Sequence, residues 1–182
     1  MRKTTLTTTF NRLRAARACA DGYRKLATHL GSVDTYGADK PINLLTVLES
    51  NGLDDTLWCL RATEQNSDRV ARLFAADCAE AVLHLFEGLY PDDKRPRQAI
   101  QAARDYAEGR IDAAAWSAAA YTAAAYTATA AAHTAAYTAA AYTAAAAAAA
   151  ARSETRTKQE ALLRRYLAPD SAGRKVKVRT DV

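Results

Sequence analysis

One stretch of the chain, residues 113–151, constrains the fold more than any other, because none of its residues carries a charge. It is built from repeated AAAYT units, and alanine has the highest intrinsic helix propensity of the amino acids. As one unbroken helix, the tract would be about 59 Å long. That length exceeds the width of a domain formed by the rest of the chain. We therefore expect the tract to protrude, to fold back as a hairpin or to meet a second copy.

Few residues elsewhere in the chain would interrupt helices. Only 7 glycines and 4 prolines occur among 182 residues, and the apolar segments are rich in Ala and Leu rather than Val and Ile. Amphipathic spacing predicts helices over 10–30, 68–88 and about 96–108, with short helices starting at Pro41 and near Asp54. The sequence therefore predicts an all-α protein, a helical domain that carries a long alanine-rich helix or helical hairpin.

Composition divides the chain into three parts. We expect a helical domain over 1–111, the alanine-rich helical segment over 112–167 and a basic tail over 168–182. The net charge of +5 comes from the C-terminal end, since Lys and Arg balance Asp and Glu over residues 1–151. The tail could attract nucleic-acid phosphates, which is a generic attraction. A solvated tail that aids solubility is the favoured interpretation.

Three features predict a soluble protein of the cytoplasm: the N-terminal residues, the tract and the cysteines. Residues 1–14 include basic residues without an apolar run behind them, so no secretory signal is expected. Alanine is weakly apolar, and Thr and Tyr dilute the tract further, so no membrane span is expected. Cys19, Cys59 and Cys78 lack metal-ligand spacing, and we expect small buried hydrophobic residues in a reducing compartment.

The helix expected over 68–88 carries two titratable side chains, Asp77 and His84, on its predicted apolar face. The apolar residues of that face are Val70, Leu73, Phe74, Cys78, Ala81 and Leu85. The charged residues predicted to lie mostly opposite are Arg69, Arg72, Glu80 and Glu87. A buried carboxylate needs a partner, and Arg61 or Arg104 could supply it.

We favour a structural ion-pair network of Asp77, His84, Arg61 and Arg104. The chemical alternative is an enzyme or metal site around Asp77, Glu80 and His84. Seven helical residues separate Asp77 from His84 by about 10 Å, which is too far for both to hold one ion directly. No phosphate-binding loop, dinucleotide-binding glycine pattern, zinc-protease motif or hydrolase nucleophile motif occurs in the sequence. We therefore predict no enzymatic activity, no metal and no cofactor.

Aromatic and polar side chains recur along the alanine tract at helical spacing. One stripe consists of Thr122, Tyr126, Thr129, His133 and Tyr137, and a second consists of Trp116, Thr127, Thr134 and Thr138. Burial of the rings within the protein is the simpler interpretation. A ridge that binds a partner is the functional alternative, because aromatic residues dominate protein contacts. The candidates for partner binding are Trp116, Tyr121, Tyr126, His133, Tyr137 and Tyr142.

The order of several segments resembles a known family. The run DDTLWCLRAT precedes RVARLFAADCAEAVLHLFEGLYPDDKRPRQAIQAARDYAEGRIDAAAWSAAA, and the alanine tract follows, so that the resemblance covers about residues 53–150. This order is similar to that of the putative immunity protein family, helical proteins of bacteria and phages. Members often interrupt the tract with Arg, where this chain has Tyr and Thr. The resemblance implies a protein that binds and neutralises a toxin or effector, and it brings no catalytic motif.

Three functions follow from these observations. The first is a non-enzymatic protein-binding module of the immunity type, or a protein that associates with itself through the tract. The second is a phage or mobile-element inhibitor that blocks a host defence or nucleic-acid-processing complex with its basic tail. The enzyme or metal site is the third.

Overall fold

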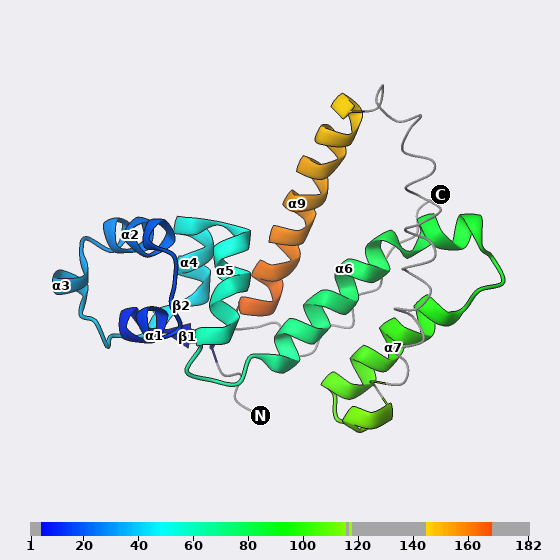
Figure 1. Ribbon diagram of the computed structural model, residues 1–182, viewed down its shortest axis with the longest axis horizontal. Coiled ribbons are helices and arrows are strands. Elements are labelled where there is room, and N and C mark those ends of the chain that lie inside the picture. The colour runs from blue at the N-terminus through cyan, green and yellow to red at the C-terminus, as the bar shows by residue number, and fades with distance from the viewer. Residues whose placement is uncertain (1–4, 116, 118–144, 169–182) are drawn as a thin grey trace. The chain divides into compact units, whose positions relative to one another are not determined.

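The computed structural model describes residues 5–115, 117 and 145–168 of the chain. Most of these residues are helical. Their remaining regular structure is one pair of two-residue strands, so the predicted all-α class is confirmed. The chain forms two compact units, Met1–Ser67 with Glu160–Val182, and Asp68–Gln159 (Figure 1). No described helix is both long enough and apolar enough to cross a membrane. The three-part division at residues 111 and 167 stays a prediction.

The N-terminal unit is built from short elements. The strands β1 (Thr7–Thr8) and β2 (Ile42–Asn43) pair antiparallel. The helices are α1 (Phe10–Ala15), α2 (Ala20–His29), α3 (Val33–Tyr36), α4 (Leu44–Asn51), α5 (Leu53–Cys59) and the 3-10 turn η1 (Leu60–Ala62). The C-terminal end of α9 (Ala145–Leu167), from Glu160 onward, belongs to the same unit.

The single helix predicted over 10–30 is wrong, because the chain turns between α1 and α2. Arg17 adopts a left-handed conformation with φ 61°, and the Ala18 N–H donates to the carbonyl of Leu13 over 2.9 Å. These features end a helix in the way that glycine usually does. The next helix starts at once, since the Cys19 sulfur accepts a hydrogen bond from the N–H of Gly22. No glycine or proline between Ala16 and Cys19 signals this break in the sequence.

The two short helices that follow begin a few residues away from their predicted starts. Pro41 lies before β2, and α4 starts at Leu44 with the side chain of Asn43 accepting from the N–H of Leu45 over 2.8 Å. α5 starts at Leu53, so Asp54 lies in its first turn rather than at its cap. An acidic residue in that turn still complements the positive end of the helix dipole.

The core of the N-terminal unit joins residues that are far apart in the sequence. Phe10 is completely buried, and its ring lies 5.2 Å from the ring of Tyr23 in an edge-to-face arrangement. The last turns of α9 add Leu163 and Leu167 to the buried residues. Each such leucine stabilises the fold by roughly 1.5–3 kcal/mol through burial. The other large buried side chains of this unit include Leu13, Leu26, Ile42, Leu44, Val47 and Leu48.

The described part of the second unit centres on two packed helices, α6 (Asp68–Leu89) and α7 (Arg95–Ala107). Both lie within a residue or two of the predicted ranges. Pro96 stands in the first turn of α7, where proline lacks only a hydrogen bond that the helix would leave unmade. Gly109 follows the helix with φ 71°, a conformation that costs glycine little.

Candidate functional site

Charged side chains, rather than apolar ones alone, join α6 to α7. The guanidinium of Arg104 on α7 donates to Asp77 Oδ1 and to Glu80 Oε2, each over 2.6 Å. All three side chains are largely withdrawn from solvent, with exposed fractions of 23% for Arg104, 18% for Asp77 and 33% for Glu80. The hydrogen bond from Arg104 lowers the pKa of Glu80, and the two carboxylates raise the pKa of Arg104. Glu80 and Arg104 are therefore ionised at neutral pH.

Two further contacts, one ion pair and one cation–π contact, join the same pair of helices. Arg97 donates to both carboxylate oxygens of Glu87, over 2.8 and 2.6 Å. The guanidinium of Arg72 lies over the ring of Tyr106, 4.6 Å from its centre. Carboxylates of α6 therefore point toward basic residues of α7, and between them lie the buried apolar residues Leu73, Ala76 and Leu83.

The packed side of α6 agrees with the predicted one in its first half, where Leu73 and Phe74 are buried, and differs from it toward the C-terminal end. Glu80 and Glu87, predicted to lie away from the core, lie against α7, whereas Ala81 and Leu85, predicted to be buried, are exposed. The physical reason is the basic surface of α7, since Arg97 and Arg104 hold the acidic side of α6 toward themselves. An amphipathic pattern fixes which residues share a face, but it does not say what that face meets.

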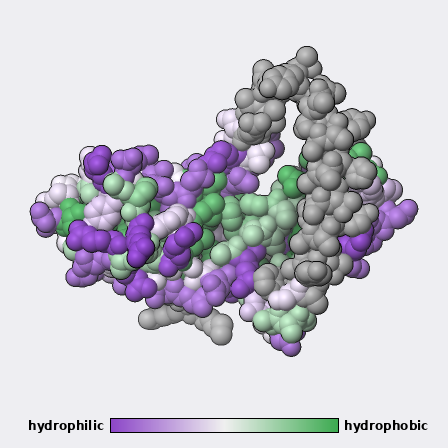
Figure 2. Space-filling view, viewed as in Figure 1, coloured by the Kyte–Doolittle hydropathy of each residue, from purple (hydrophilic) through white to green (hydrophobic). Residues whose placement is uncertain are grey.

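This orientation leaves an apolar stripe of α6 partly uncovered by the rest of the described residues: Ala71 and Cys78 are half-buried, and the other members are exposed. The stripe, which we name the α6 seam, consists of Ala71, Ala75, Cys78, Val82, Leu85 and Leu89. Its exposed fractions rise toward the C-terminal end, from 48% at Val82 to 63% at Leu85 and 75% at Leu89. Figure 2 shows hydrophobic surface in the region of α6. Within the described residues, the large apolar side chains that are exposed all lie on α6 or directly after it: Val82, Leu85, Leu89 and Tyr90.

The spacing of the α6 seam is that of a surface which packs against another helix. Its members follow one another by four, three, four, three and four residues, the repeat that lines the contact face of a coiled coil. From Ala71 to Leu89 the seam is about 27 Å long. Its first half has small side chains that let a second backbone approach closely. Its second half offers larger side chains, and the ring of Phe86 lies 5.0 Å from that of Tyr90 at this end.

Comparison with known protein families places this surface in a matched segment. Residues 61–157, just over half of the chain, match the family described as Imm-5 like putative immunity protein. The chain belongs to this family. No curated protein and no solved structure matches it. The family segment contains all of α6 and α7, and therefore the whole α6 seam.

The ion-pair residues predicted from the sequence do not all meet in the immunity-family segment. Asp77 and Arg104 are in contact, as described above. His84 lies two helical turns after Asp77 and is exposed, so its part in the network stays a prediction. Arg61 belongs to the N-terminal unit, where its guanidinium lies over the ring of Trp58, 5.1 Å from the ring centre. It is therefore engaged with an aromatic ring of its own unit.

The other predicted sites fall largely outside the described residues. All six candidates for partner binding in the tract do so: Trp116, Tyr121, Tyr126, His133, Tyr137 and Tyr142. The basic tail does so too, from residue 169 onward. In the part of the chain that the structure describes, no three His, Cys, Asp or Glu side chains are grouped in a way that could hold a metal ion. Asp77 and Glu80 share Arg104 instead.

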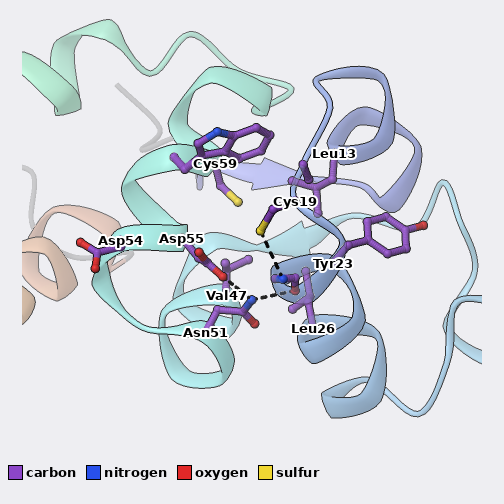
Figure 3. A pocket seen from close by; sticks show the side chains of 12 residues that line it. Leu13, Cys19, Tyr23, Leu26, Val47, Asn51, Asp54, Asp55 and Cys59 are labelled. Carbon is purple, nitrogen blue, oxygen red and sulfur yellow. Dashed lines mark hydrogen bonds between the residues drawn. The ribbon is translucent and has the colours of Figure 1, made fainter.

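A pocket in the N-terminal unit is a second feature that the sequence did not reveal. It has a volume of about 240 Å³ and lies between α2, α4 and α5 (Figure 3). Leu13, Leu26 and Val47 supply much of its apolar wall. Its polar residues are Cys19, Asn51, Asp54, Asp55 and Cys59.

Proposed function

We propose that this protein is a non-enzymatic immunity protein that binds a toxin or effector protein and neutralises it. The observation that supports this proposal most strongly is the position of the α6 seam, an exposed apolar surface inside the segment that matches the immunity family. A contiguous exposed apolar stripe is unusual in a protein that works alone, whereas single exposed leucines are common.

The proposed occupant of the seam is an apolar helix face of the toxin. A four-three spacing of side chains fits a second helix that crosses at a small angle. Burial of Val82, Leu85 and Leu89 would contribute the apolar part of the binding free energy. Binding at this surface neutralises the toxin if the covered helix is required for the toxin's activity or for its binding to its own target.

The proposal is tested with the product of a neighbouring toxin gene, first by rescue of growth on co-expression and then by isothermal titration of the purified pair. Leu85→Asp places a charge in the most exposed part of the seam, and we expect it to weaken binding at least tenfold, as for an energetically dominant residue of an interface. His84→Asp is the matched control, because it puts the same side chain at the next exposed position, off the seam. It should bind nearly as tightly as the wild type.

Three outcomes contradict parts of the proposal. If no neighbouring toxin binds, the proposed function is wrong. If both variants bind equally well, the function stands but the seam is the wrong surface. If Leu85→Asp lowers the melting temperature by several degrees and leaves the affinity unchanged, the seam is covered by another part of this chain. Light scattering adds a fourth readout, since conversion of a dimer into a monomer by Leu85→Asp would assign the seam to self-association.

A further inference from the structure

Two cysteines line the pocket of the N-terminal unit, and both are free thiols. Cys19 caps α2 and is exposed to solvent. Cys59 is the last residue of α5, and only 4% of it is exposed. In Figure 3 the two sulfur atoms point toward the same part of the pocket. Forty residues of sequence separate them, so the fold itself brings them together.

A close approach of α2 and α5 holds the cysteines in place. A methyl group added at Gly22 would lie 3.1 Å from the sulfur of Cys19 and 2.7 Å from Asp55 Oδ2, so only glycine fits there without a shift. Asp55 stands one helical turn before Cys59 on the same helix. Asn51 fixes this arrangement, since its amide donates to the Gly22 carbonyl over 2.8 Å and to Asp55 Oδ2 over 2.7 Å.

We propose that Cys19 and Cys59 form a reversible disulfide when the protein meets an oxidised low-molecular-weight thiol, such as glutathione disulfide. The site is independent of the α6 seam, and both cysteines lie outside the segment that matches the immunity family. It would connect the start of α2 to the end of α5 inside the N-terminal unit.

The exchange proceeds in two balanced steps. First, the thiolate of Cys19 attacks one sulfur of glutathione disulfide, the S–S bond of the reagent breaks, and one glutathione leaves as thiolate. Then Cys59 loses its proton to water and attacks the Cys19 sulfur, which releases the second glutathione. Two protein thiols are oxidised by two electrons, and one glutathione disulfide is reduced to two thiols.

The surroundings of the two thiols determine that Cys19 reacts first and Cys59 second. Burial, the Asp55 carboxylate and Cys19 together raise the pKa of Cys59 to about 12. A thiol that stays protonated is a poor first nucleophile, whereas it can still attack once the exposed partner has been activated beside it. Cys19 is the thiol that a dissolved reagent reaches.

The test treats the full chain with glutathione disulfide, alkylates the remaining thiols and maps the peptides by mass spectrometry. We expect a Cys19–Cys59 link, a mass lower by two hydrogens, an alkylated Cys78 and full reversal by dithiothreitol. Cys78→Ser is the matched control and should form the same link. In Cys59→Ala, Cys19 should stop at the mixed disulfide with glutathione, because the second attacking thiol is missing.

Two results would overturn the proposal. In one, the wild-type chain stops at the mixed disulfide on Cys19, as Cys59→Ala is expected to do, which means that the two sulfurs do not meet. In the other, the link involves Cys78 or joins two chains. Neither result depends on the toxin, so this test and the test of the proposed function fail independently.

Discussion

At the scale of single residues, Arg104 is the side chain of α7 that pairs with two carboxylates of α6. Its guanidinium serves two carboxylates at once, Asp77 and Glu80, in a setting where less than a quarter of the arginine side chain is exposed. Hydrogen bonds to charged groups contribute roughly 1.5–3 kcal/mol each to stability, more than neutral ones do.

We therefore expect Arg104→Ala to lower the free energy of unfolding by about 2–3 kcal/mol, as measured by urea denaturation. Arg104→Lys should recover only part of the loss, because an ammonium group lacks the planar fork that reaches two carboxylates. Arg110→Ala is the control, since Arg110 pairs with Asp105 while half exposed. A loss below about 0.5 kcal/mol for both alanine variants would contradict a structural role for Arg104.

Arg17 stores conformational strain at the end of α1. Its φ of 61° lies in the left-handed region, where a residue with a Cβ atom pays a cost that glycine avoids. We expect Arg17→Gly to raise the free energy of unfolding by about 0.5–1 kcal/mol. The reference substitution Ala15→Gly, at an exposed helical position of the same segment, should lower it by a similar amount. Destabilisation by both substitutions in urea would show that the turn is not strained.

At the scale of elements, we expect the stability of the α6–α7 pair to depend on pH. The hydrogen bond from Arg104 lowers the pKa of Glu80 below its ordinary value of 4.5. A carboxyl group whose pKa is depressed in the folded state stabilises the fold above its unfolded pKa, and this contribution is lost as the pH falls through the folded pKa. The stability difference between the wild type and Glu80→Gln should therefore be largest near pH 7.

Urea denaturation at a series of pH values checks this expectation. The difference should begin to shrink below about pH 4.5 and nearly vanish once Glu80 is protonated in both states. Ser153→Ala, on the exposed part of α9, is a suitable control because it changes no charge. A difference that stays constant from pH 7 to pH 3 would mean that the ion pair does not stabilise the fold.

The helices also show which features of an element can be predicted from the sequence. The bounds of α6 and α7 could be predicted within a residue or two, because local signals such as Pro96 and Gly109 start and stop helices. The face of α6 that meets α7 could not, because it depends on basic residues of another helix. The break at Arg17 was missed because a left-handed arginine has no signature in the sequence.

At the scale of the whole molecule, fold class and family were accessible from the sequence, whereas the candidate sites were not. The scarcity of glycine and proline predicted the all-α class, and the order of segments before the alanine tract indicated the immunity family. The α6 seam required knowledge of which side of α6 is occupied. The pocket required the approach of α2 to α5 at Gly22, which no periodicity encodes. The partner-binding residues expected in the tract, among them Tyr126 and Tyr137, remain predictions.

The central claim is that the α6 seam is open in the isolated protein and covered by its toxin. Hydroxyl-radical footprinting with and without the toxin measures this directly at individual side chains. We predict that Leu85 and Leu89 react readily in the free protein and become protected in the complex, while the buried Leu83 on the same helix stays unreactive in both. Protection of Leu85 and Leu89 already in the free monomer, or no change in either residue when the toxin binds, would contradict the claim.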